Sequence, residues 1–162
     1  MSDFDSLVST YERPIYNLIF RLMGDSEEAA DLTQETFVAA YRSMASFRGE
    51  SSEYTWLYRI AVNKCKNRFK QRDARRSREG ISLDQPDSLS TERSAAEAGT
   101  NATDPREVLE RKELRARIEQ AIRALPLDYR VMAVLRDLQG MSYDQIASVT
   151  GLSIDVVRTR IA

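Results

Sequence analysis

Residues 142–160 read SYDQIASVTGLSIDVVRTR, and this stretch has the spacing of a helix-turn-helix. Its first four residues form a capping box that opens a short helix. The small Ala147 lets two helices approach, Gly151 permits the turn between them, and Val157 anchors the second helix on the first. As a lone signal the pattern is of moderate specificity, because short helical hairpins are common. The residues that the second helix would project towards a DNA groove are Arg158, Thr159 and Arg160.

Two further helices are predicted before this hairpin. Apolar residues spaced by three and four over residues 114–125 predict an amphipathic helix that Pro126 closes. Asp128 is expected to cap a second helix, which ends at Gly140. The C-terminal module therefore takes in residues 107–162.

The N-terminal part predicts three more helices. The first covers residues 4–22; Pro14 should kink or split it, and Gly24 ends it. A capping box at residues 25–28 opens the second helix, residues 26–45. The residues of that helix expected to face a core are Ala30, Phe37, Tyr41 and Met44.

The second helix also carries a separate, mostly polar stripe. On the residues alone, the ordinary interpretation of such a stripe is a solvated face. The stripe consists of Asp31, Gln34, Glu35, Val38 and Arg42.

The third helix, capped by Ser51 or Ser52, is strongly basic. Residues 58–78 carry nine basic side chains and one acidic one, although the whole chain has a net charge of −1. Lysine and arginine bind phosphates, asparagine reads base edges, and aromatic rings stack on unpaired bases, so this helix suits a nucleic-acid surface. A basic solvated helix and a docking face for an acidic protein are the alternatives. The outward residues are Arg59, Asn63, Lys66, Asn67 and Lys70, with Lys64, Arg68 and Arg72 beside them and Tyr54, Trp56 and Tyr58 leading in.

Residues 79–106 have a different composition, mainly small, polar and acidic side chains. Such a segment cannot bury a core of its own, so it is predicted to be a flexible linker. The fold class is therefore all-α, with two small helical domains joined by this linker.

Composition argues against an enzyme or a membrane protein. The chain has no histidine and a single cysteine, Cys65, so no metal site and no disulfide framework is expected. No glycine-rich phosphate loop or nucleophile elbow is present, and no cofactor is expected. No run approaches the length of a membrane span, and the acidic N-terminus does not resemble a signal peptide, so a cytoplasmic location is predicted.

Taken together, these segments resemble the extracytoplasmic-function (ECF) group of bacterial RNA polymerase sigma factors. Several motifs occur in the order of that family and cover both modules, so the resemblance is specific. The motifs are DLTQETFVAAYR (31–42), FRG (47–49), YTWLYRIAVN (54–63), ALP (124–126) and LQGMSYDQIA (138–147).

The resemblance implies that residues 1–78 are sigma region 2. The polar stripe would then dock on the clamp coiled coil of core RNA polymerase, which replaces the solvated-face interpretation. Phe47, Arg48 and Asn63 match positions that capture a flipped base of the minus-ten element. The residues expected to meet melting DNA are Tyr54, Thr55 and Trp56, and the basic residues would hold the strand backbone.

The resemblance also implies that residues 107–162 are sigma region 4, which reads the minus-thirty-five element. The positions that match DNA-facing residues there are Arg130, Ser153, Asp155, Arg158 and Thr159, with Arg160 beside them. Asp155 is expected to favour the helix dipole rather than to contact a base. Family members continue beyond the position of Ala162, so a C-terminal truncation and an impaired minus-thirty-five contact are expected.

The implied function is that of an alternative sigma factor, which guides polymerase to promoters and helps melt them. The implied partners are core RNA polymerase, promoter DNA and an anti-sigma factor, commonly membrane-anchored, in a stress or envelope response. Two other functions stay open from the residues alone. One is a helix-turn-helix transcriptional regulator with an N-terminal interaction domain, and the other is an adaptor that does not touch DNA.

Overall fold

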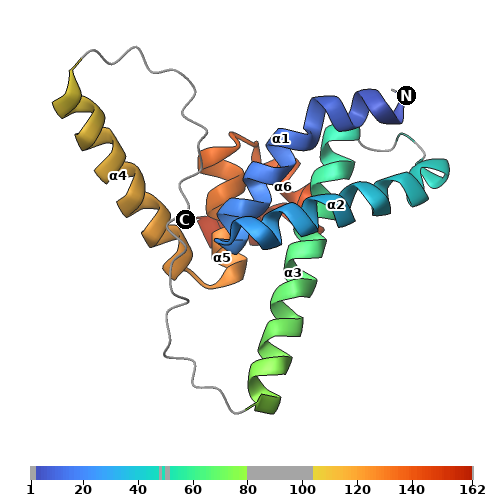
Figure 1. Ribbon diagram of the computed structural model, residues 1–162. Coiled ribbons are helices and arrows are strands. Elements are labelled where there is room, and N and C mark those ends of the chain that lie inside the picture. Colours follow the sequence, from blue (N-terminus) through green and yellow to red (C-terminus); the bar gives the residue numbers. More distant parts are fainter. Residues whose placement is uncertain (1–2, 48, 50–51, 80–103, 162) are drawn as a thin grey trace.

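The computed structural model describes residues 3–47, 49, 52–79 and 104–161, and in these ranges every element is helical, with no strand (Figure 1). The all-α prediction is confirmed. The predicted linker falls mostly outside the described residues. In chain order the elements are α1 (Phe4–Met23), α2 (Ser26–Ser43), η1 (Met44–Ser46), α3 (Glu53–Glu79), α4 (Pro105–Ala124), α5 (Leu127–Ala133), η2 (Val134–Leu138), α6 (Tyr143–Thr150) and α7 (Ile154–Ile161).

The first helix, α1, is a single helix that contains Pro14, so the predicted alternative of two separate helices is wrong. It ends as predicted at Gly24, whose φ of 77° lies in the left-handed region that glycine adopts without strain. Asp25 then caps α2 by accepting a hydrogen bond from the Glu27 amide. The predicted capping box with Glu28 is wrong, because the Glu28 carboxylate instead accepts from two arginines of α3.

The buried face of α2 is one position away from the predicted one. Phe37 is buried as expected, but Ala30 and Tyr41 are exposed and Met44 is only half-buried. Thr33 and Thr36 occupy the core face instead, and each hydroxyl donates to a carbonyl four residues earlier, which satisfies its polarity. The buried residues of α2 are Ala29, Leu32, Thr33, Thr36, Phe37 and Ala40.

The helix-turn-helix is present as predicted. Ser142 and Gln145 form the capping box of α6, and Gly151 ends that helix with a φ of 75°. Val157 of α7 is fully buried. The preceding helix starts differently from the prediction: Pro126, not Asp128, is at the N-cap of α5, and Asp128 lies in the first turn.

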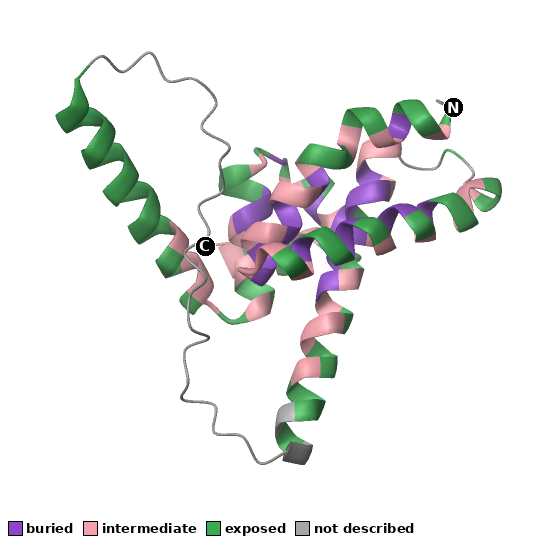
Figure 2. Ribbon diagram, in the orientation of Figure 1, coloured by how far each residue is buried: buried purple, intermediate pink, exposed green. Residues whose placement is uncertain are grey.

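The two modules share one apolar core. Figure 2 shows buried residues running from α1, α2 and α3 into the C-terminal helices, and the hydrophobic cluster is continuous across both modules. The helix α6 packs directly on α3. We call this packing of the two modules against each other the closed arrangement. It places the helix-turn-helix beside the basic helix α3.

The helix α4 projects from this body, and only its C-terminal end contacts other helices (Figure 1). Leu114 is 58% exposed and Ile118 is 45% exposed, whereas Ile122 packs against the core. The predicted amphipathic pattern is therefore real, but most of its apolar face is not buried within the chain. No helix in the described ranges is long and apolar enough to span a membrane.

Candidate functional site

The helix α3 has one buried and one open face. Leu57, Ala61 and Cys65 are fully buried against α1 and α2. Burial raises the pKa of the Cys65 thiol to about 12, which is typical of a packed rather than a reactive cysteine. Of the predicted DNA-facing residues, Arg59, Asn63, Asn67 and Lys70 are exposed, and Lys66 is half-buried.

Two basic residues of α3 turn away from this open face. The Arg68 guanidinium lies 3.2 Å from Glu35 and 3.5 Å from both Glu28 and Asp31 of α2. Arg72 forms an ion pair with Glu28. These two arginines therefore belong to the contact between α2 and α3.

The aromatic residues before and at the start of α3 pair with one another. The ring centroids of Phe47 and Trp56 are 4.8 Å apart, and those of Tyr54 and Tyr58 are 4.3 Å apart. Burial raises the pKa of the Tyr54 hydroxyl. All four rings are at least partly buried.

One predicted residue of this region, Thr55, is not presented to solvent as expected. Thr55 is 6% exposed, and its hydroxyl accepts from Ser52, the residue that caps α3. In this arrangement Thr55 therefore has a structural role at the start of α3. Arg48 lies outside the described residues.

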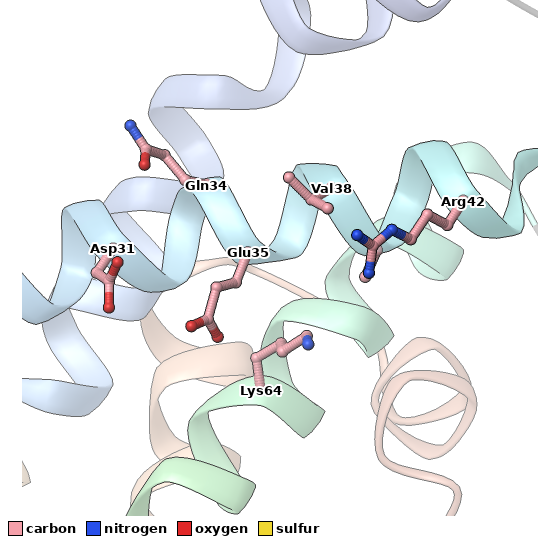
Figure 3. A pocket seen from close by; sticks show the side chains of 7 residues that line it. Asp31, Gln34, Glu35, Val38, Arg42 and Lys64 are labelled. Carbon is pink, nitrogen blue, oxygen red and sulfur yellow. The ribbon is translucent and has the colours of Figure 1, made fainter.

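The polar stripe of α2 is open to solvent. Figure 3 shows Asp31, Gln34, Glu35, Val38 and Arg42 along one side of α2, with Lys64 of α3 facing them. With Ala39 they line a shallow hollow of about 280 Å³. Val38 is 49% exposed, an apolar contact point between charged neighbours. Such a mixture of charge and open apolar surface is suited to a protein partner.

The recognition helix α7 presents its predicted residues. Ser153 accepts a hydrogen bond from the Val156 amide and so caps the helix. Asp155 lies in the first turn, where a carboxylate favours the helix dipole, and the Arg158 guanidinium is 3.9 Å from it. The Thr159 hydroxyl donates to the Asp155 carbonyl. Arg158 and Thr159 are exposed, and Arg160 is half-buried.

Arg130 is not on this reading surface. Its guanidinium donates to the Leu22 carbonyl of α1 at 2.7 Å and lies 5.3 Å from the centre of the Phe69 ring of α3. It also donates to the carbonyls of Arg123 and Leu125. The predicted minus-thirty-five residue thus joins the two modules, because the closed packing brings the end of α1 beside the start of α5.

Two further contacts between the modules involve predicted site residues or their neighbours. Arg59 donates to the Ser148 carbonyl of α6 through both Nε and Nη2. The Tyr58 hydroxyl donates to the Gln139 side chain at 3.3 Å. Sequence reasoning missed Gln139 and Ser148, since no local pattern indicates which residues of one module meet the other.

Comparison with known proteins identifies the family. Residues 7–75 match the family described as Sigma-70 region 2, and residues 115–162 match Sigma-70, region 4. The RNA polymerase sigma-H factor of Pseudomonas aeruginosa is 37% identical over 158 residues, which are 98% of this chain and 80% of the relative. The ECF RNA polymerase sigma-E factor of Haemophilus influenzae is 37% identical over 161 residues, covering 98% of this chain and 81% of the relative. The chain belongs to the ECF sigma factors.

Two solved structures resemble the fold of this sigma factor. One is the sigma factor RpoE in complex with the anti-sigma factor NepR from Bartonella quintana, with a TM-score of 0.74, 20% identity, and coverage of 99% of this chain and 91% of that one. The other is CnrH in complex with the cytosolic domain of CnrY, with a TM-score of 0.63, 23% identity, and coverage of 98% and 79%. The ECF sigma factor thus has the two-module helical fold that its family implies.

Proposed function

We propose that this ECF sigma factor binds core RNA polymerase, directs it to specific promoters and helps to melt the minus-ten element. One observation carries the proposal. The helix α3 buries one face in the core and leaves Asn63, Asn67 and Lys70 open to solvent on the other. A nucleic-acid strand needs such an open face with cations for phosphates and amides for base edges.

The polar stripe of α2 is the proposed docking surface for the clamp coiled coil of polymerase. Asp31 and Arg42 are exposed, Glu35 is half-buried, and Val38 adds an apolar contact. A partner is needed on energetic grounds, since extruding a base costs a few kcal/mol and stacking on one ring offsets about 1–3 kcal/mol. The few rings near Trp56 cannot hold a whole bubble open by themselves.

The proposed DNA contacts follow the family positions. For the minus-ten element they are Phe47, Arg48, Tyr54, Thr55, Trp56, Arg59, Asn63, Lys66, Asn67 and Lys70. For the minus-thirty-five element they are Arg130, Ser153, Asp155, Arg158, Thr159 and Arg160. Of these, Arg59 and Arg130 bond to the other module in the closed arrangement, and Thr55 is buried, so the use of these three on DNA requires a rearrangement.

Contact with both elements at once requires the modules to separate. Elements centred about 25 base pairs apart lie roughly 85 Å apart at 3.4 Å per pair. The longest helix, α3, has 27 residues and so spans only about 40 Å. Since the short helix α6 packs directly on α3, the modules in the closed arrangement are too near each other to reach both elements. We therefore divide the chain into functional units at residues 1–78 and 107–162, joined by residues 79–106.

The same proposal covers regulation and location. Two structures of similar fold contain anti-sigma factors, NepR and CnrY, which supports control of this chain by an anti-sigma factor. The proposed anti-sigma factor is membrane-anchored and acts in a stress or envelope response. The chain would act in the cytoplasm with polymerase, and it would perform no chemical step itself.

Reconstituted transcription tests the proposal. The full chain is added to core RNA polymerase on a library of promoter fragments. Promoter-specific transcripts that depend on the added chain are expected. Tight binding to duplex DNA without polymerase would instead indicate a helix-turn-helix regulator, and no salt-dependent DNA affinity with or without polymerase would indicate an adaptor.

A further inference from the structure

The Glu28 side chain has no role in the proposed contacts, yet it lies at one end of the docking stripe. Its side chain is 19% exposed, against 59% for Asp31 and 43% for Glu35. A partner protein therefore has little access to Glu28. Both of its carboxylate oxygens are used inside the chain, one by Arg68 and one by Arg72.

The three carboxylates and Arg68 form one network. Glu28, Asp31 and Glu35 follow one another at spacings of three and four, so they share one side of α2 and repel each other. Nη1 of Arg68 contacts Glu28, while Nη2 contacts both Asp31 and Glu35. The guanidinium is planar and rigid, so each contact limits the orientation of the carboxylate it reaches.

We propose that Arg68 and Glu28 are positioning residues of the polymerase-docking stripe. Glu28 anchors Arg68 from the buried side, and Arg68 holds the exposed carboxylates of Asp31 and Glu35 in place before polymerase arrives. The inference rests on the proposed function, because it requires that Asp31 and Glu35 contact core polymerase. It also removes Arg68 and Arg72 from the residues that hold the DNA strand.

Arg72 completes the network as a support for Glu28. It lies one helical turn after Arg68 on α3 and forms an ion pair with Glu28. Removal of the Arg72 side chain should therefore weaken polymerase affinity, as removal of the Glu28 carboxylate does, but by a smaller factor. Ordering these side chains in advance lowers the entropic cost of binding a partner.

The test compares two variants of opposite charge change. Glu28→Gln removes a negative charge and Arg68→Gln removes a positive one, so a simple field effect would move polymerase affinity in opposite directions. Positioning predicts that both weaken it in the same direction, by about three- to tenfold, which is the size expected for partly exposed charge contacts. Affinity is measured by fluorescence anisotropy of the labelled full chain against core polymerase.

The matched control is Lys70→Gln, which removes a positive charge from the outward face of the same helix. This variant is expected to lose affinity for single-stranded DNA, with a smaller salt slope, whereas Arg68→Gln should keep that affinity. Thermal unfolding followed by circular dichroism checks that each variant is folded at the assay temperature.

A double-variant cycle separates positioning from a purely structural role. In an Asp31→Asn/Glu35→Gln background, Arg68→Gln should cause no further loss of polymerase affinity, because it acts through those carboxylates. Full additivity, opposite effects of Glu28→Gln and Arg68→Gln, or tighter binding of Arg68→Gln would each overturn the inference. Failure of the docking proposal looks different: Asp31→Asn/Glu35→Gln would itself leave polymerase affinity unchanged.

Discussion

Replacing Arg130 with methionine should loosen the packing between the two modules. Methionine keeps an apolar chain of similar length but has no donor for the Leu22 carbonyl of α1 and no charge above the Phe69 ring. Two other contacts, to the carbonyls of Arg123 and Leu125, lie within the C-terminal module. They are therefore present in both the closed and the open arrangement and do not affect the balance between them.

The size of the effect follows from the contacts that cross between modules. A hydrogen bond from a charged donor contributes about 1.5–3 kcal/mol, and a cation over a partly exposed ring contributes about 0.5–1 kcal/mol. Desolvation opposes these gains: burial, and then the charge of Arg123, lower the pKa of Arg130, and its Nε has no hydrogen-bond partner among the described residues. A net loss of about 1–2 kcal/mol remains, which raises the ratio of open to closed chains about 5- to 30-fold.

Fluorescence energy transfer measures this ratio. Cysteines introduced at the exposed positions Glu27 of α2 and Asp144 of α6 carry the two dyes. The native Cys65 is fully buried and its pKa is raised, so it should not react with the dyes in the folded chain. The population with low transfer efficiency should grow in Arg130→Met.

The matched control is Arg136→Met, which removes an exposed arginine whose contacts, with Asp137 and the Tyr143 ring, stay within one module. Its transfer efficiency should match the parent chain. If Arg130→Met also matches the parent, Arg130 does not hold the modules together and the calculation above is wrong.

Three further outcomes are expected. Asn63→Ala should lower promoter opening, followed by permanganate reactivity, far more than polymerase affinity, and equal losses would reject a base-reading role. Gly24→Ala should lower the free energy of unfolding by about 1–2 kcal/mol, measured in urea, because φ is 77° there, in the left-handed region that residues with a Cβ adopt only at a cost. Because the pKa of Cys65 is raised from 9.0 to about 12, the unfolded thiol ionises first, and stability should fall as pH rises from about 9 to 12. That slope should be shallower in Cys65→Ala, and an unchanged slope would count against the buried thiol as its cause.

Local signals in the sequence were sufficient for much of the fold. The capping box before α6 and the glycines that end α1 and α6 were predicted correctly. The errors occurred where a side chain had a competing distant partner. Glu28 fits a capping box by spacing, but two arginines about forty residues later bind it. The core face of α2 was misplaced because threonines that bond their own backbone can be buried.

The predicted site residues also divide into those whose exposure follows from a local pattern and those that bind a distant partner. Exposure of Asn63, Asn67 and Lys70 follows from the helical period, since the opposite face of α3 is apolar. The partners of Arg59 and Arg130 do not follow from any period, because each is bonded to a carbonyl of the other module.

The amino-acid sequence alone determined the apolar periodicity of seven helical segments and the concentration of positive charge on residues 58–78. It also determined the motifs that indicate an ECF sigma factor. These properties are local, because helix caps and amphipathic faces depend on neighbours within a few turns. Only the tertiary structure decided which arginines face solvent and which face protein. That choice depends on the packing of α3 against α2 and α6 and of α1 against α5, where backbone carbonyls and carboxylates compete with solvent and DNA for the same guanidinium groups.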